Sequence, residues 1–225
     1  MIIAERKPIE EIEEIISPYN RVLILGCGTC VTICFAGGEK EVGLLASELR
    51  MKANLKGEKK EIKELTVLRQ CDWEFLEKAR EEVEWAEVTV SLACGIGVQG
   101  AAEMFAEKRV APGVNTLFLG LTEKMGLWGE RCAACTDCLL HLTAGICPIA
   151  RCAKGLLNGP CGGSQEGRCE VSPDTPCAWQ LIYQRLEKRG ELSLLDEIRK
   201  PKDWSKKNLP GKLIRDDLLL GEENE

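Results

Sequence analysis

Histidine is almost absent from this chain of 225 residues, which contains a single one, His141. A single histidine therefore argues against metal sites built from imidazole groups and against catalysis by Ser-His-Asp or Cys-His groups. An excess of positive charge is also missing, because 30 Lys and Arg residues face 36 Asp and Glu residues, for a net charge of −6. Phosphate binding needs a concentrated basic surface, so we expect no nucleic acid partner.

Long apolar runs are missing as well, since no stretch approaches the roughly 18 uninterrupted apolar residues that a membrane span needs. Residues 1–4 are too few for the hydrophobic region of a signal peptide, and charged residues follow at once. We therefore expect a cytoplasmic protein without a membrane span. Aromatic residues make up only 5% of the chain, but a hydrophobic content of 44% is enough for an ordinary core.

Cysteine, in contrast, is abundant, with thirteen residues. In a reducing cytoplasm persistent disulfides are rare, and dense cysteines indicate metal binding or catalysis. An odd number also leaves at least one cysteine without a disulfide partner. A disulfide-stapled scaffold is the less favoured interpretation, which the disulfide-rich intracellular proteins of hyperthermophiles keep open.

The first half of the chain has the pattern of an α/β fold. Strands separated by helices of roughly 10–15 residues indicate βαβ units and a small, doubly wound parallel sheet. We assign this sheet to a first domain, residues 1–122. Apolar spacing predicts helices over residues 7–17, 38–53, 72–86 and 98–108, and strands over residues 21–26, 62–69, 87–93 and 115–120.

The second half, residues 123–225, changes in composition. Eight cysteines lie among glycine, proline and small residues, and few apolar residues are available for a core. A segment of this size usually needs staples or metal centres, so we predict a cysteine-rich, metal-stabilised, ferredoxin-like domain with short helices. Helices are predicted over residues 178–189 and 191–199. Residues 200–225 are predicted to form an extended arm that a partner orders.

Cysteine follows a predicted strand of the first domain three times, as Cys27, Cys71 and Cys94. The carboxyl ends of parallel strands share one edge of an open sheet, where ligands bind, so these three thiols should converge. Cys30 and Cys34 extend the first turn as C-x2-C-x3-C, and their spacing places them on one face of a helix. The sequence predicts a thiolate metal site at this edge. Ordinary buried cysteines are the alternative.

The cysteines of the second half follow a ferredoxin-like spacing. The run begins C-x2-C-x2-C and continues to a later Cys-Pro, which is the ligand pattern of bacterial-type ferredoxins. The gap of eight residues before the Cys-Pro departs from the usual three, so the assignment of ligands to individual centres stays open. The eight candidates are Cys132, Cys135, Cys138, Cys147, Cys152, Cys161, Cys169 and Cys177.

Eight thiolates suffice for two four-thiolate centres, or for one cluster and one zinc ion. At least one [4Fe–4S] cluster is the favoured interpretation, and zinc bound by four sulfurs is the alternative, since paired C-x2-C units also form zinc ribbons. His141 stands between Cys138 and Cys147. We favour a surface or hydrogen-bonding role for it over a ligand role.

Several motifs resemble a known family. ERCAACTDC, GICPIARCAKGLLNGPCGG, CEV, PCAWQLIYQRL and the closing KDWS are similar to the methylenetetrahydrofolate reductase C-terminal domain family. GCGTCVTICFAGGEKEV, RQC and SLACGIGVQ in the first half resemble the N-terminal part of MetV-type iron–sulfur subunits. Together the motifs cover about residues 20–205.

The resemblance implies an electron-transfer role in one-carbon metabolism. MetV-type subunits accompany a flavin-containing, MetF-type TIM-barrel reductase, and the pair reduces methylene- to methyl-tetrahydrofolate, notably in the reductive acetyl-CoA pathway. The resemblance implies two or more [4Fe–4S] clusters in this chain, a flavin in the partner, and a further electron-donor subunit or a ferredoxin. The chain would be an accessory redox subunit of an oxidoreductase, not catalytic alone.

By matching positions, the five cysteines of the first half would supply an N-terminal site, and the other eight would supply the sites of the second half. Five candidates for four positions leave one over, and Cys27 is our candidate for it. Two other functions stay open. One is a zinc-stabilised assembly module without electron transfer, and the other is an enzyme in which a zinc thiolate at the strand-end site handles a methyl group.

Overall fold

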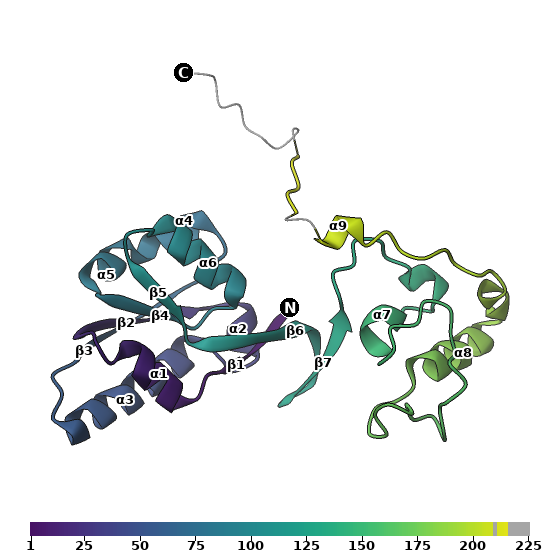
Figure 1. Ribbon diagram of the computed structural model, residues 1–225, viewed down its shortest axis with the longest axis horizontal. Helices are drawn as coiled ribbons and strands as arrows, with labels where there is room; N and C mark the ends of the chain where they lie inside the picture. The colour runs from purple at the N-terminus through teal and green to yellow at the C-terminus, as the bar shows by residue number, and fades with distance from the viewer. Residues whose placement is uncertain (209–210, 216–225) are drawn as a thin grey trace, which may run out of the picture. The chain divides into compact units, whose positions relative to one another are not determined.

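The computed structural model describes residues 1–208 and 211–215. The chain divides into two compact units, Met1–Glu130 and Arg131–Glu225 (Figure 1). The boundary that the sequence analysis placed after residue 122 falls inside a strand of the first unit, β6 (Val114–Lys124).

A parallel four-stranded sheet forms the centre of the first unit, as predicted. Its strands are β2 (Arg21–Cys27), β3 (Glu61–Val67), β4 (Val88–Ser91) and β5 (Arg109–Pro112), in the order β3-β2-β4-β5. After its first residue, β2 is buried throughout, as expected for a parallel strand that is covered on both faces. The chain runs outward from β2 to β3 and then returns to β4 on the other side. The topological switch point therefore lies between β2 and β4.

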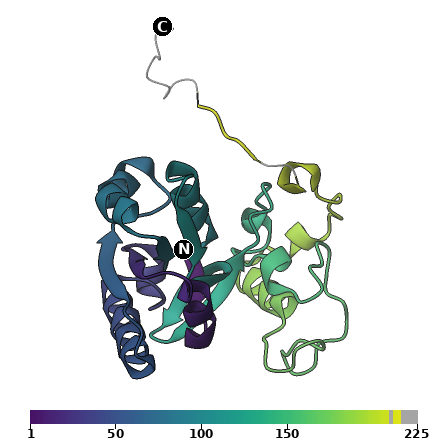
Figure 2. The ribbon, with the colours of Figure 1, turned by 60° about the vertical axis from the view of Figure 1, so that its left-hand side comes forward.

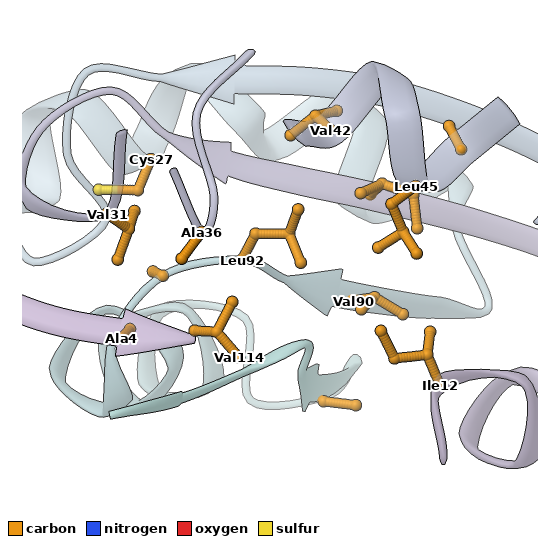
Figure 3. Packing of buried hydrophobic residues seen from close by; sticks show 14 of the residues in the cluster. Ala4, Ile12, Cys27, Val31, Ala36, Val42, Leu45, Val90, Leu92 and Val114 are labelled. Carbon is orange, nitrogen blue, oxygen red and sulfur yellow. The ribbon is translucent and has the colours of Figure 1, made fainter. Parts of the chain in front are cut away.

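Helices cover both faces of this sheet, which makes it doubly wound (Figure 1). On one face, Val22 and Ile24 pack with α1 (Ile9–Ile16) and α3 (Glu39–Lys56), and Figure 3 shows part of this core. On the other face, Leu23 and Leu25 pack with the remaining helices. These are α4 (Trp73–Leu76), η1 (Glu77–Ala79), α5 (Arg80–Trp85) and α6 (Gly95–Met104). The single helix predicted over residues 72–86 is thus three short helical segments.

The fourth predicted strand, residues 115–120, does not lie in the parallel sheet. It is part of β6, the middle strand of a separate three-stranded sheet of order β1-β6-β7. β1 (Ile2–Arg6) pairs antiparallel with β6, and β7 (Leu127–Cys132) is the other neighbour. The fourth parallel strand is instead β5, a four-residue segment that begins at the end of the predicted helix 98–108. Four residues are too few to show the apolar pattern by which a strand is recognised in a sequence.

The second unit contains short helices separated by irregular loops (Figure 2). Its small core consists of Trp179, Ile182 and Leu186 of α8 packed on Ala144 and Ile146. The prediction of α8 is confirmed over Ala178–Arg189, but the helix predicted over residues 191–199 is wrong except for a 3-10 turn. The other elements are η2 (Leu140–Leu142), α7 (Pro148–Arg151), η3 (Leu192–Leu195) and α9 (Ser205–Asn208).

Of the predicted C-terminal arm, residues 209–210 and 216–225 lie outside the described residues. Nowhere in the described part of the chain is a helix long and apolar enough to cross a membrane.

Candidate metal centres

The structure brings the three strand-end cysteines into one electrostatic neighbourhood. Cys27 is the last residue of β2, Cys71 lies four residues beyond β3, and Cys94 is the residue before α6. Partial burial raises the pKa of the Cys71 thiol, and electrostatic interaction with the nearby side chains of Cys27 and Cys94 raises this pKa further. Both effects oppose loss of the Cys71 proton while the site holds no cation. A bound cation would stabilise all three thiolates at once.

Close backbone contacts hold the first cysteine loop against its neighbours. The Cys27 N–H donates to the Gly37 carbonyl at 2.9 Å, and the Gly28 N–H donates to the Val67 carbonyl at 2.9 Å. A Cβ on Gly37 would stand 1.8 Å from the Leu92 carbonyl oxygen, so only glycine permits this approach. The loop that follows β2 therefore lies against the ends of both β3 and β4.

Cys30 and Cys34 have different surroundings within this loop. Cys30 begins the short helix α2 (Cys30–Ile33) and is partly exposed, whereas Cys34 is 6% exposed and belongs to the apolar core. The Cys34 thiol donates to the carbonyls of Ala4 at 3.5 Å and Val31 at 3.6 Å. Burial raises its pKa, which favours the neutral thiol. Cys34 thus has the environment of a structural cysteine.

Four cysteines of the second unit line a single, largely enclosed cavity: Cys152, Cys161, Cys169 and Cys177. Cys152 directly follows α7 and Cys177 directly precedes α8. Backbone hydrogen bonds from Cys169 to Thr175 (2.9 Å) and from Cys177 to Gly167 (2.8 Å) fold the intervening loop back on itself. Thiols that are spread over 26 residues of sequence therefore surround one space.

Polar groups beside this cavity interact with its thiols. The Cys161 thiol donates to Glu170 Oε1 at 3.4 Å, and the Gly163 N–H donates to Cys161 Sγ at 3.5 Å. The Lys154 ammonium forms an ion pair with the Glu170 carboxylate, and this contact lowers the pKa of Glu170. The cavity therefore has a charged pair beside it as well as four sulfur donors.

The other four cysteines of this unit lie on the C-x2-C-x2-C loop and at its Cys-Pro. Two of them accept backbone N–H groups at sulfur, Cys132 from Ala134 at 3.4 Å and Cys147 from Ala150 at 3.5 Å. The residues between the first three cysteines include two with positive φ, Ala134 (49°) and Thr136 (66°), which curl the loop tightly. N–H groups directed at sulfur are a feature of iron–sulfur sites, where they tune the reduction potential. The remaining members of this group are Cys135 and Cys138.

Lys202 anchors this loop from a distant part of the sequence. Its side chain is nearly fully buried, and its ammonium group donates to the Asp137 carbonyl and lies 3.5 Å from Asp137 Oδ2. Neither Lys202 nor Glu170 was predicted from the sequence, because the spacing of cysteines does not identify the charged side chains that lie near them in the folded chain. His141 is exposed on η2.

All thirteen cysteines are free thiols, so the disulfide-stapled alternative is wrong for this structure. Within residues 1–208 and 211–215, no three His, Cys, Asp or Glu side chains are grouped closely enough to hold a single metal ion. A zinc ion bound at about 2.3 Å by four tetrahedral sulfurs holds these sulfurs roughly 3.8 Å apart. The four thiols of the second-unit cavity are soft sulfur donors, which iron–sulfur clusters and zinc both accept.

Comparison with protein families relates the C-terminal part of the chain to a reductase. Residues 111–205 match the family described as methylene-tetrahydrofolate reductase C terminal. The match covers less than half of the chain, and it contains all eight cysteines of the second half and none of the first five. Comparison with curated proteins and with solved structures finds no match.

Proposed function

We propose that this chain is an iron–sulfur, electron-transfer subunit of a methylenetetrahydrofolate reductase complex. In this proposal it relays electrons to the flavin of a MetF-type partner, which reduces methylene- to methyl-tetrahydrofolate. A further subunit or a ferredoxin supplies the electrons. The observation that carries the proposal is the cavity that four free thiols line together. The relation of residues 111–205 to a methylene-tetrahydrofolate reductase family supports the choice of reaction.

The thirteen cysteines divide into three sets of four and one remainder. The strand-end set contains Cys27, Cys71 and Cys94, which interact electrostatically, and we add Cys30 because it is partly exposed on the loop that follows Cys27. The remainder is Cys34, whose thiol faces backbone carbonyls in the core. This division replaces Cys27 with Cys34 as the cysteine that is not a ligand. The two sets of the second unit are the loop set, Cys132, Cys135, Cys138 and Cys147, and the cavity set, Cys152, Cys161, Cys169 and Cys177.

A [4Fe–4S] cluster, when bound, supplies the ability to take up and release one electron at a time. The residues of this chain supply thiolates, backbone N–H donors and nearby charges. Ala134, Ala150 and Gly163 direct N–H groups at sulfurs, and such donors stabilise the more negative, reduced state. The folate chemistry itself belongs to the flavin of the partner in this proposal.

Metal analysis of the whole chain, purified without oxygen, tests the proposal. We expect iron and acid-labile sulfide, with an EPR signal after reduction. Cys161→Ala should remove the iron of one centre and Cys71→Ala the iron of another. The double variant should lose both, because the two residues belong to separate units. Colourless protein that contains zinc alone would contradict electron transfer and favour a zinc-stabilised assembly module, because zinc is redox-silent.

Partner dependence is a separate measurement. The chain mixed with its MetF-type partner should pass electrons from a reduced donor to the flavin, which is followed by flavin absorbance. The Cys71→Ala, Cys161→Ala double variant should bind the partner and fail to reduce the flavin. Methylenetetrahydrofolate reduction by the isolated chain would refute the assignment of an accessory role.

A further inference from the structure

A fully buried amide lies directly beside the strand-end cysteines. Gln70 stands between β3 and α4 with 0% of its surface exposed. A buried amide without hydrogen-bond partners is destabilising, so the partners of the Gln70 amide indicate its structural role. Gln70 Nε2 donates to the carbonyls of Leu25 at 2.9 Å and Gly26 at 3.0 Å. Its Oε1 accepts a hydrogen bond from Ser91 Oγ at 2.7 Å.

These hydrogen bonds join the three strands that carry the cysteines. The pairing of β2 with β4 ends at Leu25 and Ser91, and the amide of Gln70 continues the connection one residue further, at Gly26. Ser91 Oγ also accepts the Ala93 N–H at 3.3 Å, which carries the network into the loop after β4. The carbonyl end of β2, the loop after β3 and the loop after β4 are therefore parts of one network.

The network meets the backbone at the residue before each cysteine. Gly26 precedes Cys27, Gln70 itself precedes Cys71, and Ala93 precedes Cys94. A change in the backbone at any of these positions moves the Cα of the following cysteine. One hydrogen-bond network thus links the positions that precede three cysteines lying 23 to 67 residues apart in the sequence.

Helix α6 packs tightly against Gln70 and limits its movement. A Cβ on Gly97 would lie 2.9 Å from Gln70 Cβ, and a Cβ on Gly100 would lie 2.8 Å from the Gln70 carbonyl oxygen. Glycine at these two helix positions therefore lets α6 approach the Gln70 backbone. These contacts hold the backbone and Cβ of Gln70 in place.

We infer that Gln70 is a positioning residue for the strand-end metal centre, which sets the separation of Cys27, Cys71 and Cys94 through its hydrogen bonds to Leu25, Gly26 and Ser91. This inference rests on the proposed function, because it needs a metal centre at that edge. Gln70 is not itself a ligand. Its role resembles that of outer-shell groups at other metal sites, whose loss typically costs roughly 10- to 100-fold in metal affinity.

Gln70→Leu and Ser91→Ala test this inference in the whole chain. Gln70→Leu removes all three hydrogen bonds of the amide, whereas Ser91→Ala removes only the branch toward Cys94. Thr89→Val is the matched control, because Thr89 is equally buried on β4 and lies outside the network. The measurements are iron release to a chelator, the EPR spectrum of the reduced protein and the midpoint potential of each centre.

We expect Gln70→Leu to release the iron of the strand-end centre about 10- to 100-fold faster and to shift its EPR signal and potential. Ser91→Ala should have a smaller effect in the same direction. The centres of the second unit should keep their signals in both variants, and Thr89→Val should behave as wild type. These centres are the internal standard for folding and iron loading.

The outcomes separate this inference from the proposed function. If the Cys71→Ala variant loses no iron although the wild-type protein contains it, there is no strand-end centre; this outcome overturns the inference and leaves the proposed function to the centres of the second unit. Wild-type protein that loses iron on Cys71→Ala, with unchanged iron release and potential in Gln70→Leu, overturns the role of Gln70 alone. Equal effects of Gln70→Leu and Thr89→Val would also overturn it, because they would show a general loss of stability.

Discussion

Replacing Cys34 by alanine separates a core cysteine from a metal ligand. Cys34 and Cys27 are nearly equally buried, at 6% and 7% exposure, and both belong to the same apolar cluster. The two substitutions therefore remove the same atom from similar surroundings. We expect Cys34→Ala to keep the full iron content of the chain, and Cys27→Ala to lose the iron of the strand-end centre.

The effect of Cys34→Ala on stability follows from its packing. The thiol donates to carbonyls at 3.5 and 3.6 Å, and a weak donor at these distances contributes little. The main loss is the burial of one sulfur, comparable to a methylene at about 0.8 kcal/mol, together with a small cavity. A total of about 1–2 kcal/mol lowers the melting temperature by roughly 2–8 °C in a chain of this size.

Three measurements on the two variants show which cysteine is a ligand: iron content, the EPR spectrum and thermal unfolding. Cys34→Ala should melt a few degrees below wild type with unchanged EPR signals. The assignment of ligands would be refuted if Cys34→Ala lost the EPR signal of the strand-end centre while Cys27→Ala kept it. Cys34 would then be the ligand, and Cys27 the cysteine that binds no metal.

Three further predictions concern other parts of the molecule. Ile182→Ala should destabilise the second unit by about 2–5 kcal/mol in chemical unfolding, because Ile182 is fully buried in the small core of that unit. Lys202→Met should lower the potential of the proposed loop-set centre by a few tens of millivolts (about 40 mV corresponds to about 1 kcal/mol for one electron), because it removes a positive charge that stabilises the more negative reduced state, and an unchanged potential would contradict this. Glu13 accepts hydrogen bonds from two lysines of α3, which lower its pKa, so its contribution to stability is present above the ordinary carboxyl pKa and is lost as pH falls through the lowered value. Urea unfolding should therefore show Glu13→Gln less stable than wild type at pH 7, with a difference that shrinks in acid.

The parts of the fold that were predictable have strong local patterns. β2 is a continuous buried apolar run and α8 has a clear helical period with Gly190 as its left-handed cap, and both lie where the sequence places them. β1 and β5 were missed because each is a segment of only four or five residues, too short to show a clear strand pattern in the sequence. β6 was found as a strand but assigned to the wrong sheet, because its antiparallel partner lies more than a hundred residues away.

As with the fold, only those features of the candidate site that follow from a local sequence pattern were predictable. The position of Cys27, Cys71 and Cys94 at the ends of parallel strands follows from topology, which a strand-and-helix pattern reveals. The environment of Cys34 could not be predicted in this way, because it depends on a contact with Ala4 of β1. The sequence pattern did not reveal that strand. The partners of Gln70 and Lys202 are likewise determined by tertiary structure, so no local spacing identifies them.

The two units hold their cysteines by different physical means. In the first unit the described core clusters contain 21 and nine buried residues, and buried hydrogen bonds fix the strand ends without any metal. In the second unit the described cluster contains six buried residues, one of which is a cysteine of the cavity set. Metal binding that orders loops contributes directly to folding, so iron should stabilise the second unit far more than the first. We therefore expect the first unit to keep its fold when iron is removed, and the second unit to lose structure under the same treatment.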